Sequence, residues 1–84
     1  MESEYELQIG ESRMLKRSFL TSTSIIFGGM PSESVFSVVV VATSGNASLA
    51  YNLYIPVTQK TLNIAKRTIT VYAVNRHSFR FRYN

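Results

Sequence analysis

The sequence contains no cysteine, no aspartate and no tryptophan, and its single histidine is His77, beside Arg76. Small secreted domains usually depend on disulfides, so the absence of cysteine favours a reducing, cytoplasmic compartment. A Ser-His-Asp or Cys-His site lacks its residues, and the residues that could bind zinc form no cluster of three or four ligands. We therefore expect a protein that is not an enzyme, uses no metal or cofactor, and has no evident small-molecule substrate.

Long hydrophobic runs are also missing. The longest spans residues 38–42, which is far too short to cross a bilayer, and the acidic stretch at residues 1–10 does not read as a signal peptide. We expect no membrane partner. A chain of 84 residues has room for one hydrophobic core, so residues 1–84 are expected to form a single domain.

Acidic residues are scarce and unevenly placed, although the net charge is only +4. No acid follows residue 33, and the acids of the chain are Glu2, Glu4, Glu6, Glu11 and Glu33. The second half of the chain instead carries six cations, Lys60, Lys66, Arg67, Arg76, Arg80 and Arg82. This asymmetry indicates either attraction to a polyanion or two chain ends that meet in the fold.

The hydrophobic residues mostly recur with a period of two, which is typical of half-buried strands. Residues 4–9 alternate, and residues 47–55 alternate with Leu49, Tyr51, Leu53 and Ile55 on one face. Residues 34–43 are rich in valine with little alternation, which predicts a central strand covered on both faces. Further strands are expected around residues 62–64, 68–74 and 78–83. The expected turns lie at residues 10–12, 28–31, 44–46, 58–60, 66–67 and 75–77.

The stretch from residue 12 to residue 27 is ambiguous. We predict one long, bent strand there, with a helix of one or two turns over residues 12–20 as the alternative. In total this gives six or seven short strands. The pattern predicts an all-β domain, a small barrel of the size of SH3 or OB domains, with a sandwich as the alternative.

The last strand, "SFRFRY", combines aromatic and basic residues in a way that suggests nucleic-acid binding. However, a period of two places Phe79 and Phe81 on one face and Arg80 and Arg82 on the other. Single-strand binders use rings and cations on the same accessible face. An alternative is that the strand pairs with residues 4–8, so that the arginines face glutamates across the two strands.

These observations leave two functions open. The first is a protein-interaction or assembly module that binds a protein partner or forms a homo-oligomer, with Tyr54 and Tyr72 as outward-facing interface residues. The second is an RNA- or single-stranded-DNA-binding barrel. Its phosphate contacts would be Lys60, Lys66, Arg67, Arg76, Arg80 and Arg82, with binding that weakens steeply as salt rises.

Overall fold

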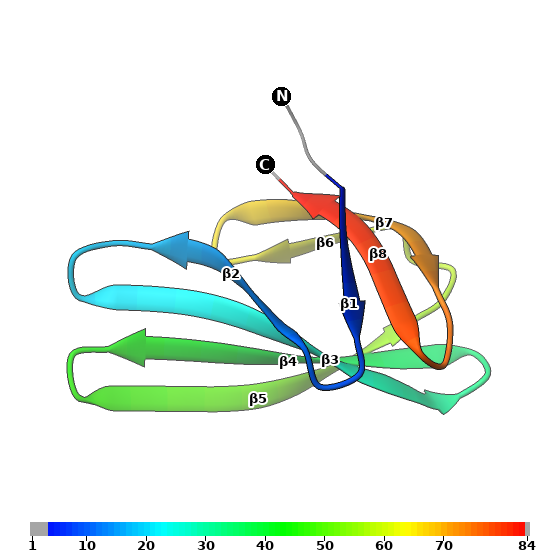
Figure 1. Cartoon of the computed structure of the whole chain (residues 1–84), viewed down its shortest axis with the longest axis horizontal. Helices are drawn as coiled ribbons and strands as arrows, with labels where there is room; N and C mark the ends of the chain where they lie inside the picture. The colour runs from blue at the N-terminus through cyan, green and yellow to red at the C-terminus, as the bar shows by residue number, and fades with distance from the viewer. Residues whose placement is uncertain (1–3, 84) are drawn as a thin grey trace.

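The computed structural model describes residues 4–83, which form eight strands in two antiparallel sheets of four (Figure 1). Sheet A contains, in spatial order, β1 (Glu4–Gln8), β8 (Ser78–Tyr83), β7 (Arg67–Val74) and β6 (Thr61–Ile64). Sheet B contains β2 (Ser12–Arg17), β3 (Thr21–Ser32), β4 (Val35–Ser44) and β5 (Ala47–Pro56). The all-β prediction is confirmed. The strand pairing of residues 4–83 closes no barrel, so the sandwich alternative fits as well as the barrel.

The core lies between the two sheets and is centred on phenylalanines. Phe79 of β8 contacts Phe27 of β3 and Phe36 of β4 with ring centroids 5.7 and 5.3 Å apart, and it stacks on Phe81 of its own strand. Phe27, Phe36, Phe79 and Phe81 are all completely buried. The expected division of the last strand, with its rings inside and its arginines outside, is therefore correct.

β4 lies between β3 and β5, as expected of the valine-rich segment, but the core covers only one of its faces. Phe36, Val38 and Val40 are buried between the sheets, whereas Val39 and Val41 on the opposite face are only half-buried. The expectation that both faces are covered is wrong, because no third layer lies outside sheet B in the described chain.

Residues 12–27 form neither one long strand nor a helix. They form a hairpin of β2 and the first part of β3, with the turn at Ser18, Phe19 and Leu20. Both expectations were wrong because this turn contains no glycine, proline or asparagine, the residues by which turns are usually recognised.

The expected break at residues 28–31 is also absent, since β3 continues to Ser32 and the chain turns at Glu33 and Ser34. The register between β3 and β4 shifts on both sides of Gly29, whose φ of 93° is accessible mainly to glycine. The glycines therefore mark bulges within a strand rather than its end.

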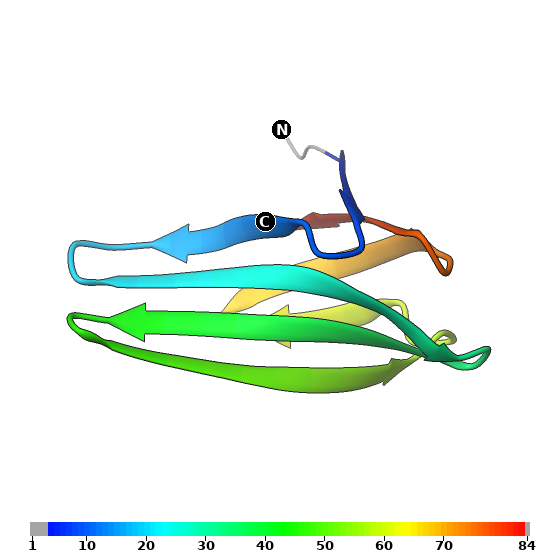
Figure 2. The ribbon, with the colours of Figure 1, turned by 60° about the horizontal axis from the view of Figure 1, so that its bottom comes forward.

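Sheet B is longer than sheet A and projects beyond it (Figures 1 and 2). On β3 and β4, burial on the inner face of sheet B ends at the neighbouring residues Ile25 and Val40. We call the projecting part the arm, which comprises residues 16–23 of the β2–β3 hairpin and residues 41–51 of the β4–β5 hairpin. Leu49 and Tyr51 belong to the arm and are 64% and 45% exposed, although they share a face with the buried Ile55.

The β6–β7 hairpin turns at Ala65 and Lys66, one residue before the expected position, so that Arg67 begins β7. Both turn residues have positive φ, 53° and 65°, which matches a two-residue type I′ turn. Such turns favour Asn-Gly, because other residues are strained in the left-handed region.

We therefore expect the double replacement Ala65→Asn and Lys66→Gly to raise the free energy of unfolding by about 1–2 kcal/mol. Urea denaturation followed by circular dichroism measures this change. Lys66→Ala is the control, because it removes the same side chain without relieving the backbone. Equal stability of the two variants would show that the turn is not strained.

Candidate interaction surfaces

The arginines of the last strand lie opposite glutamates of the first strand. β1 and β8 pair antiparallel, with Glu4 opposite Arg82 and Glu6 opposite Arg80. Nη2 of Arg80 donates to Oε1 of Glu4 at 2.6 Å, in a pair whose two side chains are each about half exposed. The chain ends thus meet, and the acidic start of the described chain neutralises part of its basic end. This is the cross-strand pairing that the sequence offered as the alternative to phosphate binding.

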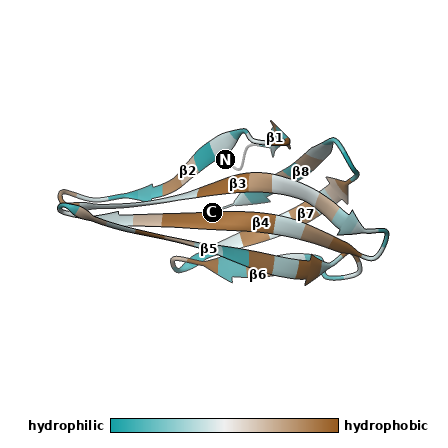
Figure 3. Ribbon diagram, turned by 90° about the horizontal axis from the view of Figure 1, so that it is seen from below, coloured by the Kyte–Doolittle hydropathy of each residue, from teal (hydrophilic) through white to brown (hydrophobic). Residues whose placement is uncertain are grey.

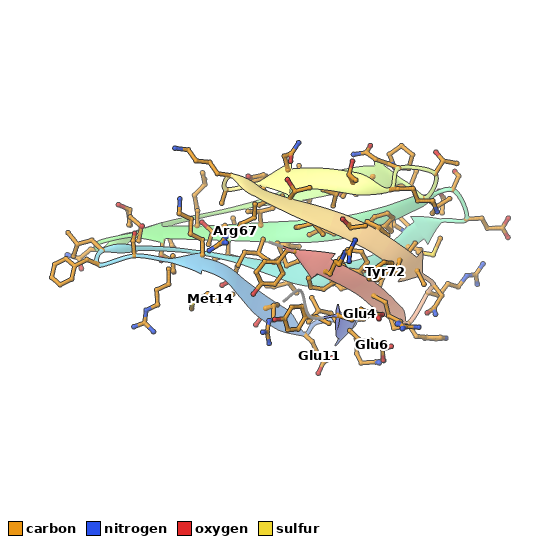
Figure 4. The ribbon with its side chains drawn as sticks, turned by 90° about the horizontal axis from the view of Figure 1, so that it is seen from above. Glu4, Glu6, Glu11, Met14, Arg67 and Tyr72 are labelled. Atoms are coloured by element: carbon orange, nitrogen blue, oxygen red, sulfur yellow. The ribbon has the colours of Figure 1, made fainter. Side chains whose placement is uncertain are left out.

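Arg82 also has its partners within the fold. Its guanidinium carbon lies 5.4 Å from the ring centroid of Tyr72, a cation–π arrangement on the outer face of sheet A. Figure 4 shows Tyr72 on this sheet, with Glu4 and Glu6 further along the β1 side.

The remaining four candidate phosphate contacts are spread around the molecule. Lys60 and Lys66 flank the two ends of β6, roughly 20 Å apart at about 3.3 Å per residue. Arg67 lies beside Lys66, well away from Glu4 and Glu6 (Figure 4). Nη2 of Arg76 lies 3.8 Å from Oε1 of Glu33, in the turn between β3 and β4. The fold therefore brings together Lys66 and Arg67 but not all six cations.

Arg13 holds the two sheets together at their β1–β2 side, a role that the sequence gave no signal for. Its guanidinium carbon lies 3.7 Å from the centroid of the Tyr5 ring, which stacks on Tyr83 at 5.2 Å. Hydrogen bonding to Tyr83 raises the pKa of Arg13 above its usual value, and burial opposes this only in part. The hydroxyl of Tyr83 in turn donates to the carbonyl oxygen of Met14 at 3.2 Å.

The two tyrosines expected at an interface are both exposed, but they lie on opposite sides of the molecule. Tyr54 projects from the outer face of sheet B, since its neighbour Ile55 points into the core. Tyr72 projects from sheet A, where β7 is irregular between Val71 and Ala73. One flat partner could not contact both residues.

Three of the four strands of sheet B are uncharged, and the charged residues of that sheet all lie on its edge strand β2. Sheet A carries Glu4, Glu6, Arg67, Arg80 and Arg82, whereas β3, β4 and β5 contain no charged residue. Figure 3 shows hydrophobic residues running along β3 and β4 of sheet B. Apolar and small polar side chains therefore make up most of sheet B, where contacts with another protein would desolvate little charge.

The edge strand β5 is the least covered part of sheet B. Eight of its ten residues are exposed, and it pairs with β4 over its whole length without a bulge. Its free edge carries ten residues without charge or glycine, and its one proline is the last residue, Pro56. The sequence indicated the strand but not this exposure.

A groove of about 650 Å³ lies at the far end of β3 from the arm. Gly28 packs closely against Ser37 in its lining, since a Cβ atom on Gly28 would lie only 2.8 Å from Oγ of Ser37. The rim carries the ion pair of Arg76 and Glu33, whose side chains are both largely exposed. The two charges of this rim neutralise one another.

No group of three potential metal-ligating side chains occurs within residues 4–83. The same residues include no helix long and apolar enough to cross a membrane.

The chain matches no protein-family model, and no curated protein or solved structure is significantly similar to it.

Proposed function

We propose that the protein is an assembly module that self-associates through the free edge of β5. The observation that carries this proposal is the edge itself, which offers ten uncharged residues in an unbroken register. An exposed edge strand presents unpaired N–H and C=O groups to any strand that can align with it. Pairing two such edges satisfies these groups and extends sheet B across both copies.

The other three edge strands of the described chain carry features that oppose pairing. β1 has five residues, two of them glutamates, and β6 has only four residues between two lysines. β2 carries Arg13, Lys16 and Arg17 and is interrupted by a bulge between Met14 and Lys16. Short length, charge and bulges are the devices by which proteins protect edges. β5 is long, uncharged and without a bulge, so its edge is open to pairing with another strand.

A second copy of the same chain fits this edge. Two-fold symmetry places β5 against itself in antiparallel orientation, which is the commonest arrangement of a homodimer. Because β5 has no charged residue, self-pairing brings no like charges together. Residues that oppose each other across two antiparallel strands must point to the same face of the sheet, and neighbouring residues of one strand point to opposite faces. A residue can therefore not oppose the copy of its neighbour, so the two-fold axis lies where one residue opposes its own copy.

The geometry of the arm supports the same arrangement. β5 runs from the arm tip at Ala47 to the body at Pro56, so antiparallel pairing sets the arm of each copy beside the body of the other. Leu49 and Tyr51 would then lie next to β6 at the neighbouring edge of the second copy's sheet A. Self-pairing thus covers two of the large apolar side chains that the fold leaves exposed.

We expect wild-type protein to show a monomer–dimer equilibrium in sedimentation velocity, and Asn52→Lys to raise the dissociation constant at least about tenfold. Asn52 is exposed near the middle of β5, so each copy would carry a new cation close to that of its partner. The matched control is Gln8→Lys, an exposed position on β1 at the opposite edge of sheet A from β6. A strictly monomeric wild-type protein, or an equal effect of the two lysines, would contradict the proposal.

The absence of cysteine allows a second test, which also locates the two-fold axis. Single cysteines at residues 50–54 should form intermolecular disulfides most readily where a residue opposes itself, because bridged Cα atoms lie about 4.4–6.8 Å apart. Gln8→Cys, on β1, serves as the control. Equal cross-linking at all positions, including the control, would indicate random collision rather than strand pairing.

A further inference from the structure

The end of the arm presents two consecutive apolar side chains to solvent. Phe19 is 96% exposed and Leu20 is 65% exposed, and both lie in the turn between β2 and β3. This turn forms one end of the molecule's long dimension (Figures 1 and 2). It is therefore a convex apolar knob that the protein's own core does not cover.

Hydrogen bonds hold the knob in place. The N–H of Ser18 donates to the carbonyl oxygen of Thr21 at 2.8 Å, and the two hydroxyl groups of these residues hydrogen-bond across the turn. The N–H of Gly45, in the neighbouring β4–β5 turn, donates to the carbonyl oxygen of Leu20 at 2.9 Å. The two hairpin tips therefore support each other, and Phe19 and Leu20 are presented without a large ordering cost.

The only charged residues of the arm are both cations. Lys16 and Arg17 are exposed directly before the turn, and the arm contains no acid. The nearest acids along β2 and β3 are Glu11 and Glu33, which lie beyond the opposite ends of these strands. The arm end thus combines exposed apolar side chains with uncompensated positive charge.

We propose that the arm tip docks on an anionic lipid surface, with Phe19 and Leu20 entering the boundary between headgroups and acyl chains. Lys16 and Arg17 would contact the lipid phosphates just behind them. Apolar side chains with adjacent cations are the combination that binds to such interfaces. Docking of this kind requires no membrane-spanning segment, so the short hydrophobic runs from which we expected no membrane partner do not exclude it. A convex knob flanked by cations fits a deformable anionic surface better than the uncharged edge of β5.

The depth of the arm fits such docking. Leu49 lies opposite Ala42, two or three residues back from the hairpin turns at the end of the arm. At about 3.3 Å per residue, the distance from Leu49 to the end of the arm is roughly 7–10 Å. Interfacial elements are typically buried by about 5–10 Å. In the undimerised chain, Leu49 would therefore approach the headgroup level on full insertion, while the ion-paired surface of sheet A remains in water.

Docking by the arm tip does not require dimerisation through β5. In the proposed dimer the two arms point in opposite directions and the body of one copy lies beside the arm of the other, so only Phe19 and Leu20 of one arm would meet a given lipid surface. Asn52→Lys should therefore weaken dimerisation without weakening vesicle binding by the arm tip. The two proposals can thus fail separately, one in the dimerisation assay and the other in the vesicle assay.

The test is flotation with phosphatidylcholine vesicles, with and without phosphatidylserine. Wild-type protein should float with the anionic vesicles, and the double variant Phe19→Ser/Leu20→Ser should bind them at least about tenfold more weakly. Tyr54→Ser/Ile9→Ser is the matched control, because these exposed side chains lie at the other end of the molecule. This control should float like wild type.

The cations are tested in the same assay. Lys16→Gln/Arg17→Gln should remove most of the preference for anionic vesicles, whereas Lys60→Gln/Arg76→Gln should retain it. If wild-type protein binds neither vesicle, or if the arm and control variants bind alike, the proposal is wrong. Loss of self-association in the Phe19→Ser/Leu20→Ser variant without any vesicle binding would instead assign the tip to a protein contact.

A spectroscopic readout is available because the chain has no tryptophan. Phe19→Trp should shift its emission to the blue when anionic vesicles are added, since the indole ring leaves water. Tyr54→Trp, at the end of β5 away from the arm tip, should not shift. A shift of both probes, or of neither, would contradict docking by the arm tip.

Discussion

Replacement of Phe79 by alanine should lower the free energy of unfolding by about 3–5 kcal/mol, the range for removal of a buried phenylalanine ring. Phe79 is completely buried and contacts rings from both sheets, Phe27 and Phe36 in sheet B and Phe81 in sheet A. The cavity would form at the junction of the two layers, where no flexible loop can fill it. Since small domains have a total stability of about 5–15 kcal/mol, the variant should be close to unfolding.

Urea denaturation measures this loss, and the chain provides a matched control. Phe19→Ala makes the same chemical change at a side chain that is 96% exposed, so it should change the free energy of unfolding by less than about 0.5 kcal/mol. A small loss for Phe79→Ala would mean that the two sheets do not share one core. A large loss for Phe19→Ala would place this ring against protein, as in a self-associated state.

The alternation of the last strand made the burial of Phe79 predictable from sequence. The same alternation, combined with opposite charge, also offered the pairing of residues 4–8 with residues 78–82 as one of two alternatives, and this pairing is the one observed. Both predictions rest on local pattern, because a period of two fixes which side chains share a face. Pairing by charge then selects among the registers that keep the apolar faces together.

The turn at Phe19 could not be predicted in this way. A turn without glycine, proline or asparagine looks like a continued strand, and two apolar residues at the tip strengthen that impression. Conversely, Gly28 and Gly29 resemble a break although they form bulges within β3. Glycine in a strand signals either outcome, and the choice depends on the pairing partner.

The exposure of Leu49 and Tyr51 shows a different kind of limit. Alternation correctly places both residues on the face of Ile55, which is buried. Whether that face is covered depends on how far the opposite sheet extends, and sheet A ends before the arm begins. The arm, the free edge of β5 and the apolar tip all follow from this difference in strand length, which no single segment encodes.

The sequence likewise identifies the six cations of the second half as a possible phosphate-binding set, but it carries no information on the distances between them in the fold. In the fold, Arg80 lies against Glu4, Arg82 lies over Tyr72, and Arg76 lies near Glu33. Phosphate binding by all six cations would require these contacts to be exchanged for contacts to a ligand. The structural role of the last strand's arginines can therefore be tested directly.

Reversal of both arginines, Arg80→Glu/Arg82→Glu, should destabilise the protein by about 2 kcal/mol, because two favourable cross-strand neighbours become two repulsive ones. The adjacent strands β1 and β8 would then carry four carboxylates in two opposed pairs, and the cation over Tyr72 would be lost. The loss should shrink at high salt, since these side chains are partly exposed and their interactions are screened. Adding Glu4→Arg and Glu6→Arg to the same chain restores opposite charges across β1 and β8 and should recover most of the stability.

The matched control reverses two exposed cations that flank β6, Lys60→Glu/Lys66→Glu, and should change the stability by less than about 0.5 kcal/mol. Urea denaturation at low and high salt measures all three variants, and fluorescence anisotropy with a labelled single strand measures nucleic-acid binding. If the arginines act within the fold, their reversal lowers stability and the rescue variant recovers it. If their reversal leaves stability unchanged but abolishes a binding constant that falls steeply with salt, Arg80 and Arg82 are phosphate contacts, and the cross-strand pairs are incidental to the fold.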